Sequence, residues 1–434
     1  MKFLYNILAI LLVLAATPVF VFRLLREEGF GERLKQSFGF LPAEALRPVA
    51  GKDCLWLHAA SVGEIVAASP IVKEIRREMP QVPITVSVVT AHGYAMAKRI
   101  IPEADSIIFF PLDLPWLSHS VIKRIRPKLF LLVETELWPN FLLAAKLMDI
   151  PVMMINGRIS DKSVDRYRHL RSILKDMLGT IVRFCMQSTI DAQYIIRLGA
   201  DPKRVFVTGN TKYDQTYTDV DPAEQAELVR TLGFAGRSPL VVAGSTHRGE
   251  EELLYSAFNQ IKAAFPQAGL VIAPRDILRA DELVLMAEQQ GLAAVRRTDA
   301  NLAAGGHDVL ILNTIGELGK VYSIGNIVYV GGSLVPHGGH NILEPAAHGK
   351  PILVGPHMFN FKDSYALLSG KGACGTVYDG AELSEKLLFL LCHDEARETM
   401  GQEALSIIRE NRGAARKSLS HVLAVLESRA MKSH

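Results

Sequence analysis

The sequence predicts an α/β protein with two Rossmann-like, doubly wound domains facing a central cleft, preceded by a membrane-anchoring helix. Two stretches of the chain alternate short, apolar, β-favouring runs with helix-like segments, which is typical of parallel sheets covered on both faces. A polar stretch at residues 213–224 interrupts the alternation, and we interpret it as a linker. An apolar run at residues 3–22 precedes both series. The predicted parts are therefore 1–24, 25–212, the linker, and 225–434.

Composition sets the class of protein. The chain has 434 residues, which exceeds the usual size of one domain, and 49% of them are hydrophobic, enough for a large core. Its 48 Lys+Arg against 45 Asp+Glu give a formal charge of +3, which argues against a nucleic-acid partner. The four cysteines form no C-x-x-C pair, which favours a reducing compartment without disulfides or zinc. They are Cys54, Cys185, Cys374 and Cys392.

The N-terminal run at residues 3–22 is uncharged and long enough to cross a hydrocarbon core as a helix. Lys2 precedes it and Arg23 and Arg26 follow, so charge does not settle its orientation. A cleavable signal peptide is the alternative, but no convincing small-residue cleavage site is present, which favours a retained anchor. Pro18 could also kink the helix into a shallow insertion.

The strands of both series can be placed from their apolar runs. In the first series they are expected at residues 54–58, 84–90, 106–110, 129–134, 152–156, 182–186 and 205–208, with a helix at 65–77. In the second series they are expected at residues 239–243, 269–273, 309–313, 327–330, 351–354 and 375–378. From residue 394 the chain has a helical pattern with a break at Gly413.

The two series open on similar segments, Leu57-His-Ala-Ala-Ser-Val-Gly-Glu64 and Val242-Ala-Gly-Ser-Thr-His-Arg-Gly-Glu250. Each predicts a strand, a loop of small residues and a glutamate at the head of a helix. Glu64 therefore lies at a strand's carboxyl end, where α/β sheets present functional groups. We expect the helix dipole to hold Glu64 ionised, which suits a proton acceptor. A helix-terminal charge without chemistry is the alternative.

A second acidic segment, Glu134-Thr-Glu-Leu-Trp-Pro139, follows the strand predicted at 129–134, and Pro139 fits a first helical turn. Its carboxylates could bind an acceptor hydroxyl or orient a basic partner, or they could only cap the helix.

A glycine-rich loop follows the strand at 327–330. It contains two glycine pairs, Gly331-Gly332 and Gly338-Gly339, and ends at Asn341, which is placed to cap a helix with Glu344 three residues on. Free backbone N–H groups and the helix dipole predict a phosphate site here. An ordinary β-α turn is the alternative.

Two more strand ends of the second series carry similar groups. Pro274-Arg275 follows one strand, and arginine can hold a phosphate bidentately. Thr314-Ile-Gly-Glu-Leu-Gly319 follows another and offers a further helix start. We expect these segments to converge on one sheet edge.

Other classes of site are disfavoured. Four histidines fall within a short span, but no H-E-x-x-H or acidic pair accompanies them, so contact with phosphate or backbone is the better interpretation than metal. They are His337, His340, His348 and His357. No G-x-S-x-G elbow, G-x-G-x-x-G or Walker loop is present, which argues against serine hydrolases, dehydrogenases and P-loop enzymes.

A set of motifs occurs along nearly the whole chain in an order that closely resembles the Kdo (3-deoxy-D-manno-octulosonic acid) transferases of Gram-negative bacteria. The motifs are Ser61-Val-Gly-Glu64, Glu134-Thr-Glu-Leu-Trp-Pro139, Asn156-Gly-Arg158, Thr208-Gly-Asn210, Ser245-Thr-His247, Gly331-Gly-Ser-Leu-Val335, Gly338-Gly-His-Asn341 and Gly355-Pro-His-Met-Phe-Asn-Phe361. The resemblance implies a glycosyltransferase of GT-B architecture in lipopolysaccharide biosynthesis.

The resemblance also implies substrates and site residues. The C-terminal domain would bind the donor CMP-Kdo, and the N-terminal domain with its anchor would accept the lipid A precursor (lipid IVA) at the inner membrane, on the cytoplasmic face. Glu64 aligns with the family's proposed general base. The implied CMP contacts are Pro274, Arg275, Ile315, Gly316, Glu317, Asn341, Ile342, Leu343 and Glu344. Ile342 stands where close relatives often carry proline, a change that a backbone contact tolerates.

We therefore expect an inverting, metal-independent transfer without a cofactor, in which Glu64 deprotonates the acceptor hydroxyl and CMP departs with its phosphate on backbone N–H groups and Arg275. A nucleotide-sugar epimerase of the same fold, or a glycosyltransferase acting on a soluble sugar, is the alternative. Neither would need the apolar run at 3–22, so membrane lipid is among the expected partners.

Overall fold

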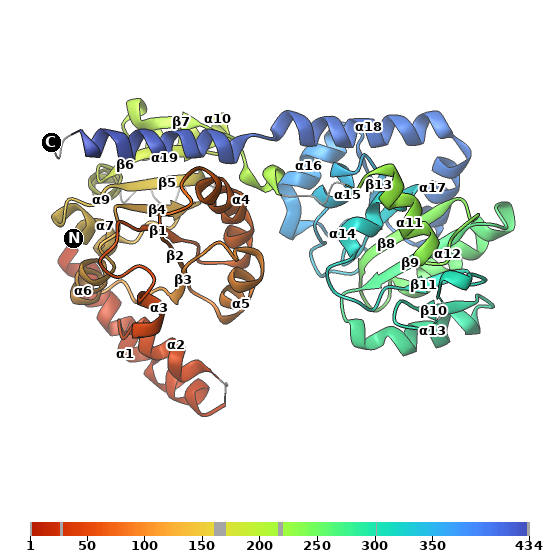
Figure 1. Cartoon of the computed structure of the whole chain (residues 1–434), viewed down its shortest axis with the longest axis horizontal. Coiled ribbons are helices and arrows are strands. Elements are labelled where there is room, and N and C mark those ends of the chain that lie inside the picture. The colour runs from red at the N-terminus through yellow and green to blue at the C-terminus, as the bar shows by residue number, and fades with distance from the viewer. Residues whose placement is uncertain (1, 27–28, 160–170, 216–219, 301, 432–434) are drawn as a thin grey trace. The chain divides into compact units, whose positions relative to one another are not determined.

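The computed structural model describes a chain that divides into two compact units, each built on its own sheet (Figure 1). The described residues are 2–26, 29–159, 171–215, 220–300 and 302–431. Unit 1 comprises Met1–Gln215 together with Asn411–His434, and unit 2 comprises Thr216–Glu410.

The sheet of unit 1 is parallel throughout its described part. In spatial order its strands are β3 (Ser106–Phe109), β2 (Ile84–Val88), β1 (Leu55–His58), β4 (Leu129–Val133), β5 (Val152–Gly157), β6 (Ile181–Met186) and β7 (Val205–Val207). The four residues of β1 and the five of β2 and β4 are all buried, as expected for strands covered on both faces. The strands predicted for the first series are confirmed.

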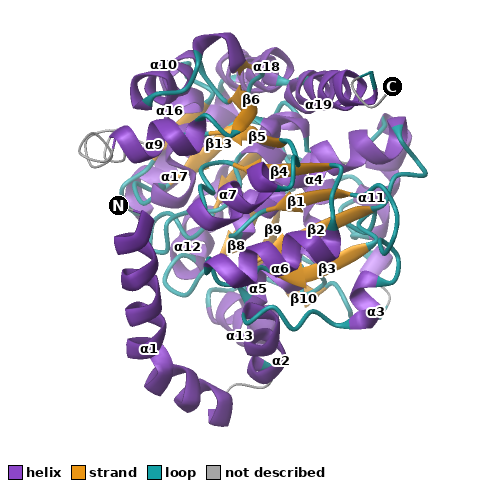
Figure 2. Ribbon diagram, turned by 90° about the vertical axis from the view of Figure 1, so that its left-hand side faces the viewer, coloured by secondary structure: helices purple, strands orange, loops and turns teal. Residues whose placement is uncertain are grey.

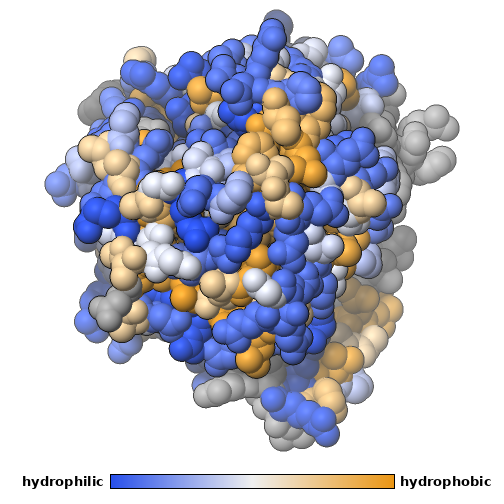
Figure 3. All heavy atoms as spheres, turned by 90° about the vertical axis from the view of Figure 1, so that its right-hand side faces the viewer, coloured by the Kyte–Doolittle hydropathy of each residue, from blue (hydrophilic) through white to orange (hydrophobic). Residues whose placement is uncertain are grey.

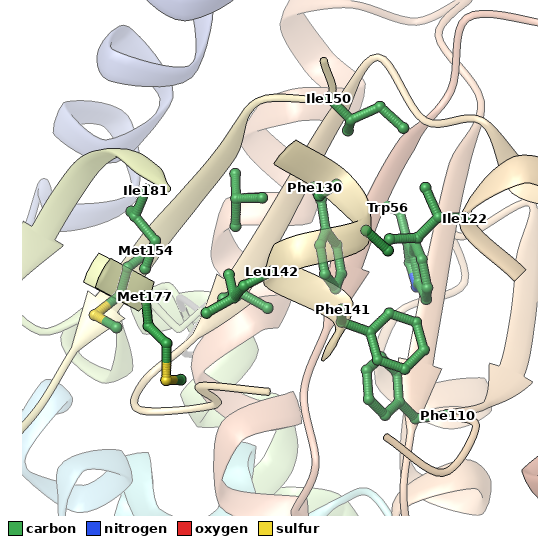
Figure 4. Packing of buried hydrophobic residues seen from close by; sticks show 14 of the residues in the cluster. Trp56, Phe110, Ile122, Phe130, Phe141, Leu142, Ile150, Met154, Met177 and Ile181 are labelled. Carbon is green, nitrogen blue, oxygen red and sulfur yellow. The ribbon is translucent and has the colours of Figure 1, made fainter. Parts of the chain in front are cut away.

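Alternate residues of these strands supply two separate cores. On one face Trp56 stacks on Phe130 with ring centroids 4.4 Å apart, and Phe141 packs against Phe110 at 4.3 Å (Figure 4). On the other face Leu55 and its neighbours pack under α4 (Val62–Glu78). Both faces of the strand that leads to Glu64 are therefore tightly packed.

The sheet of unit 2 is also parallel. In spatial order its strands are β10 (Ala294–Arg296), β11 (Val309–Ile311), β9 (Gly269–Pro274), β8 (Leu240–Thr246), β12 (Ile327–Val330), β13 (Ile352–Val354) and β14 (Cys374–Thr376). The six predicted strands are confirmed, but β10 was not predicted. It is a three-residue edge strand whose residues are all partly exposed, so it has no apolar run to reveal it.

Helices connect the strands and cover both faces of each sheet (Figures 1 and 2). Besides α4, those of unit 1 are α1 (Lys2–Arg26), α2 (Phe30–Ser37), α3 (Ala43–Leu46), α5 (Ala91–Ile100), α6 (Pro115–Ile125), α7 (Pro139–Leu147), α9 (Arg171–Leu178), α10 (Thr189–Leu198) and α19 (Ala414–Ala430). Those of unit 2 are α11 (Pro222–Thr231), α12 (Glu251–Ala264), α13 (Ala280–Gln289), α14 (Leu318–Val321), α15 (Leu343–Ala347), α16 (Lys362–Gly370), α17 (Gly380–Cys392) and α18 (Asp394–Asn411).

The C-terminal helix α19 belongs to unit 1, whereas the predicted division assigned residues 225–434 to one C-terminal domain. Leu419 and Val422 of α19 are buried in the core beneath α4, and Figure 1 shows α19 running beside β5 and β6. Asp214 accepts hydrogen bonds from the N–H groups of Gly413 (2.5 Å) and Ala415 (2.6 Å). Asp214 lies in the predicted linker and thus caps a helix of unit 1. The predicted break at Gly413 is confirmed, with φ 96°.

Helix α1 carries the predicted anchor. Its segment Tyr5–Arg23 is, among the described residues, long and apolar enough to cross a membrane, and Pro18 lies inside the continuous helix. The first turn of α1 is fastened to unit 1, because Tyr5 Oη donates to Asp113 Oδ2 (2.8 Å) and Asn140 Nδ2 donates to Asn6 Oδ1 (3.0 Å). Figure 2 shows α1 at the periphery of unit 1, descending toward α2.

Apolar exposure differs along the chain. Leu11, Leu12 and Leu14 of α1 are between 55% and 70% exposed, so this helix presents a continuous apolar surface that water does not favour. On the face drawn in Figure 3 hydrophilic residues predominate, and apolar residues occur in small groups between them. The exposed apolar surface of α1 therefore needs a membrane or another apolar cover.

Candidate active site

Glu64 lies in the first turn of α4, directly beyond the carboxyl end of β1. Ser61 is the N-cap of α4, and its Oγ accepts from the Glu64 N–H (3.3 Å). The same hydroxyl lies 2.8 Å from Glu64 Oε1, and the Ala60 N–H donates to Glu64 Oε2 at 2.7 Å. The carboxylate is thus fixed by two neutral donors and is only 9% exposed.

Burial, and after it the charges of Glu136 and Glu134, raise the pKa of Glu64, whereas the hydrogen bonds from Ala60 and Ser61 lower it. The net pKa is about 7. The expectation that the helix terminus holds this carboxylate ionised is therefore wrong. Loss of water and nearby like charge outweigh the dipole of α4. A carboxylate with a pKa near neutrality is well matched to accepting a proton at physiological pH.

The acidic segment after β4 lies next to Glu64. Lys212 Nζ is 3.4 Å from Glu134 Oε1, and Trp138 Nε1 donates to Glu136 Oε2 at 2.9 Å. The buried His58, last residue of β1, places Nε2 3.5 Å from the same Glu136 oxygen. Glu134 has φ 57°, a left-handed conformation that is uncommon outside glycine and often found at functional sites.

The prediction that this segment orients a basic partner agrees with the Glu134–Lys212 pair. The alternative, that its carboxylates cap the following helix, is wrong. Helix α7 begins at Pro139 as predicted, but the N–H groups of Asn140 and Phe141 donate to Asp113. Lys212 and His58 were not predicted as site residues, and Lys212 follows the Thr208-Gly-Asn210 motif closely enough to have been a candidate.

In unit 2 the predicted segments follow four neighbouring strands, β11, β9, β8 and β12. Because these strands are parallel, their carboxyl ends meet at one sheet edge, and the predicted convergence is confirmed at the level of topology. His348 Nε2, at the end of α15, lies 2.7 Å from the carbonyl oxygen of Gly319 in the segment after β11.

Pro274 ends β9, and the exposed Arg275 follows it, with its N–H donating to the Thr246 carbonyl (2.9 Å). Ile315 is 74% exposed and Gly316 has φ 97°. Glu317 accepts from Arg297 Nε (3.0 Å) and from Thr314 Oγ1 (2.6 Å). Burial raises the pKa of Glu317, but these donors outweigh it and hold the pKa below its ordinary value. Glu317 is thus an ionised carboxylate.

The glycine loop after β12 differs from its prediction. The N–H groups of Gly332, Ser333 and Leu334 donate to the buried carboxylate of Glu250 at 2.8, 3.1 and 3.0 Å, and the Gly339 N–H donates to the Gly332 carbonyl at 2.7 Å. The expectation of free amides at both glycine pairs is therefore wrong, because an internal carboxylate already occupies the first anion-binding turn.

Residues 341–344 form the start of α15. Asn341 Oδ1 accepts from the Leu343 N–H (3.1 Å), and its Nδ2 donates to Glu344 Oε1 (3.1 Å). The predicted N-cap is wrong, because Ile342 is the N-cap residue and Glu344 bonds a side chain instead of a backbone N–H. Asn341 nevertheless orders the start of the helix. Ile342 and Leu343 are buried, so a ligand here would meet their backbone. Burial raises the pKa of Glu344.

Two residues of this edge were missed by sequence reasoning, Glu250 and His247. Both lie in the segment Val242-Ala-Gly-Ser-Thr-His-Arg-Gly-Glu250, whose likeness to the segment around Glu64 was the available signal. His247 Nε2 lies 2.8 Å from His340 Nε2. Within the described residues no group of three or more His, Cys, Asp or Glu side chains is arranged to hold a metal ion.

Solved structures share this fold. A putative UDP-N-acetylglucosamine 2-epimerase from Listeria monocytogenes is 15% identical, with a TM-score of 0.55 over 87% of this chain and 97% of its own. The UDP-GlcNAc 2-epimerase of Neisseria meningitidis, also 15% identical, gives 0.54 over 82% and 98%. At this identity the likeness shows the fold alone, that of the two-domain GT-B enzymes.

Sequence relatives carry the identification further. The sequence model of the 3-deoxy-D-manno-octulosonic-acid transferases (kdotransferases) matches residues 32–215. The 3-deoxy-D-manno-octulosonic acid transferase of Haemophilus influenzae is 33% identical over 92% of both chains, and that of Bordetella pertussis is 30% identical over 88% of this chain and 89% of its own. The chain is therefore a glycosyltransferase. It belongs to the Kdo transferase family of lipopolysaccharide biosynthesis.

Proposed function

We propose that the protein transfers Kdo from CMP-Kdo to the lipid A precursor (lipid IVA), with inversion at the anomeric carbon and without a metal ion or other cofactor. The observation that carries this proposal is Glu64, a buried carboxylate with a pKa of about 7 at a strand end, in a chain of the Kdo transferase family. The nearby Glu134 is paired with Lys212, whereas the hydrogen-bond donors of Glu64 are neutral.

Glu64 acts as the general base. Its ionised carboxylate takes the proton from the primary hydroxyl of the acceptor glucosamine while that oxygen forms a bond to the anomeric carbon of Kdo. The bond between this carbon and the phosphate oxygen breaks on the opposite side, and CMP leaves with the electron pair. Attack opposite the leaving group inverts the anomeric configuration. Ser61 and Ala60 hold the carboxylate in place for the proton transfer.

The donor is bound by unit 2. In this proposal the nine residues implied by the resemblance, from Pro274 to Glu344, surround the nucleotide at the shared edge of β11, β9, β8 and β12. Arg275 is exposed at this edge and supplies the positive charge that the departing phosphate needs. The amides of Gly332 to Leu334 are already bonded to Glu250. Side chains therefore hold the donor phosphate to a greater extent than the sequence predicted.

The acceptor is a membrane lipid, and α1 keeps unit 1 at the surface that holds it. The apolar surface of α1 enters the bacterial inner membrane, and both units lie on the cytoplasmic side, where a nucleotide-sugar is available. The bonds of Tyr5 and Asn6 to Asp113 and Asn140 fix the first turn of the helix to unit 1. This arrangement restricts the enzyme to lipid acceptors near the bilayer surface.

The first prediction tests Glu64 directly. Full-length Glu64→Gln protein, incubated with CMP-Kdo and lipid IVA, is expected to lose turnover by about 100-fold or more, the usual contribution of a general base, because glutamine cannot accept the proton. CMP binding should stay unchanged, since the nucleotide residues lie in unit 2. Mass spectrometry of the lipid product and calorimetry with CMP measure the two quantities.

The matched control is Glu78→Gln, an exposed glutamate at the end of the same helix, which should retain full turnover. Near-normal turnover of Glu64→Gln would exclude the assignment of the base.

A further inference from the structure

Three histidines gather beside Arg275 at the carboxyl edge of the second sheet. His247 belongs to the loop between β8 and α12, and His337 and His340 belong to the loop between β12 and α15. The Nε2 atoms of His247 and His340 are 2.8 Å apart. The ring of His337 stacks on that of His247 with centroids 4.2 Å apart. His337 is exposed and the other two are partly exposed, so the cluster can reach a ligand.

The surrounding backbone leaves room for the rings of His247 and His340 to lie close together. Gly332 has φ +65°, and a Cβ atom there would lie 3.0 Å from His340 Cδ2 and 3.2 Å from His247 Cδ2. A side chain at position 332 would therefore crowd both rings. The N–H of His247 donates to Glu250 at 2.9 Å, which also holds the Gly332 N–H. The same buried carboxylate thus fixes both loops and sets the distance between the two imidazoles.

The distance between the two Nε2 atoms restricts where protons can lie. At 2.8 Å one nitrogen must donate and the other must accept, so only one proton fits between them. In the neutral pair the second ring proton lies on Nδ1 of the accepting histidine. A third proton, on Nδ1 of the donating histidine, makes the pair a single cation that shares the central proton. The pair can therefore switch between a neutral and a singly charged form without moving.

The groups around the pair oppose the charged form. Burial lowers the pKa of His247, as do His337, Arg275 and Arg279, while Glu250 raises it. Burial, His247, Arg275 and His337 together lower the pKa of His340 to about 4. The pair is therefore neutral near pH 7, because the negative charge of Glu250 does not outweigh burial and the neighbouring cations.

We infer that His247 and His340 form a proton-linked anion site, which takes up one proton from solvent when an anionic group of the donor binds beside Arg275. This inference rests on the proposed function, because CMP-Kdo brings two candidate anions, its phosphate and the carboxylate of the acidic sugar. A bound anion supplies further negative charge and raises the pKa of the pair, and the resulting cation strengthens its hold on the anion. Binding and protonation reinforce each other by linkage.

This coupling also bears on product release. Once the bond between Kdo and CMP is broken, the two anions separate, and each alone stabilises the cation less than both together. The pair then holds its proton less strongly, which weakens the site for the remaining anion. The histidines thus favour the intact donor over its separated parts.

The experiment is calorimetry on the full-length protein with CMP and with free Kdo as separate ligands, between pH 6 and pH 8. Each titration is run in two buffers of different ionisation enthalpy, which gives the number of protons taken up. After correction for the ionisation of free CMP, uptake should approach one proton per ligand. The affinity should rise toward tenfold per pH unit as the pH falls. Uptake with CMP identifies the phosphate as the anion, and uptake with Kdo alone identifies the carboxylate.

Variants locate the proton. His247→Gln and His340→Gln should each abolish the additional uptake and flatten the pH dependence, whereas the exposed His393→Gln, elsewhere in unit 2, should behave as the parent protein does. If a variant fails to fold, the proton uptake of the parent protein still tests the inference. Normal CMP binding with no additional proton uptake for either ligand overturns the inference and leaves the proposed function intact. A parent protein that binds no CMP at all overturns the proposed function instead.

Discussion

Glu64 in unit 1 and Glu250 in unit 2 occupy similar places but have opposite surroundings. Each follows the first strand of its sequence series and lies at the head of the next helix, α4 or α12. Glu64 accepts hydrogen bonds from one backbone N–H and one serine hydroxyl. Glu250 is fully buried and accepts from four backbone N–H groups and the hydroxyl of Tyr329.

This difference separates a carboxylate that can do chemistry from one that holds the fold. Five donors occupy the two oxygens of Glu250 and tie this carboxylate to the surrounding backbone. Glu64 has fewer donors, is largely buried, and lies near the charges of Glu136 and Glu134, so its pKa reaches about 7. Sequence likeness between the two segments therefore reflects a shared local fold, and the number of donors decides the role.

The largest effect on stability is expected for Glu250→Gln. The glutamine NH2 group would replace an oxygen that serves two backbone N–H groups, such as those of His247 and Gly332. Two buried donors without acceptors cost about 2–6 kcal/mol of the free energy of unfolding. Urea denaturation followed by circular dichroism measures this loss, with the transitions of the two units analysed separately.

Two variants make that comparison specific. Glu64→Gln should lose turnover but unfold within about 1 kcal/mol of the parent protein, because it keeps an acceptor for Ala60. The exposed Glu288→Gln in α13 controls for a glutamate change within unit 2. If Glu250→Gln unfolds at the same urea concentration as Glu288→Gln, the structural role assigned to Glu250 is wrong.

A smaller effect is expected at the glycines that precede the two glutamates. Gly249 has φ +95°, so alanine there should cost about 1–2 kcal/mol of unfolding free energy. Gly63 lies inside α4, and a Cβ atom there would meet only Ser61 Oγ, at 4.0 Å. Gly63→Ala should therefore be neutral or stabilising by up to about 1 kcal/mol. Thermal unfolding of both variants measures the difference, and equal losses would show that the two turns are not distinct in the way described.

Most of the fold could be predicted from the sequence because each buried parallel strand appears there as a short apolar run. The residues of β4 and β12, and those of β1 before His58, are apolar along the strand. Strand β10 has no such apolar run, since it is short and partly exposed. The return of α19 to unit 1 was also missed, because the amphipathic pattern of a helix shows that it packs but not which core it packs on.

The candidate site was predicted unevenly for a similar reason. Glu64 and Arg275 could be proposed because each follows a predicted strand, a local property of the sequence. The pairing of Glu250 with the amides of residues 332–334 joins positions more than 80 apart in the chain. The pKa of Glu64 likewise depends on Glu136 and on burial. Neither local periodicity nor residue type contains such distant contacts, so the occupied anion turn and the raised pKa required the structure.

The smallest effect, and the finest test of the comparison, is expected for Glu136→Gln. Below the pKa of Glu64, about 7, protonation removes the base, so kcat/KM for lipid IVA at saturating CMP-Kdo should fall tenfold per pH unit on the acid side in the parent protein. The charge of Glu136 makes ionisation of Glu64 harder. Its removal should lower the pKa of Glu64 and move the acid limb to lower pH by up to about one pH unit.

Glutamine at position 136 keeps an oxygen for the Trp138 Nε1 donor, so the change removes charge more than structure. Glu134, Lys212 and His58 also face this site and keep their contributions in the variant. The pH profile of kcat/KM for Kdo transfer to lipid IVA measures the shift, with Glu78→Gln as the control that should leave the limb in place. An acid limb at the same pH in Glu136→Gln would mean that the charge of Glu136 does not raise the pKa of Glu64. The contrast with Glu250 would then depend on burial and donors, without the neighbouring charge.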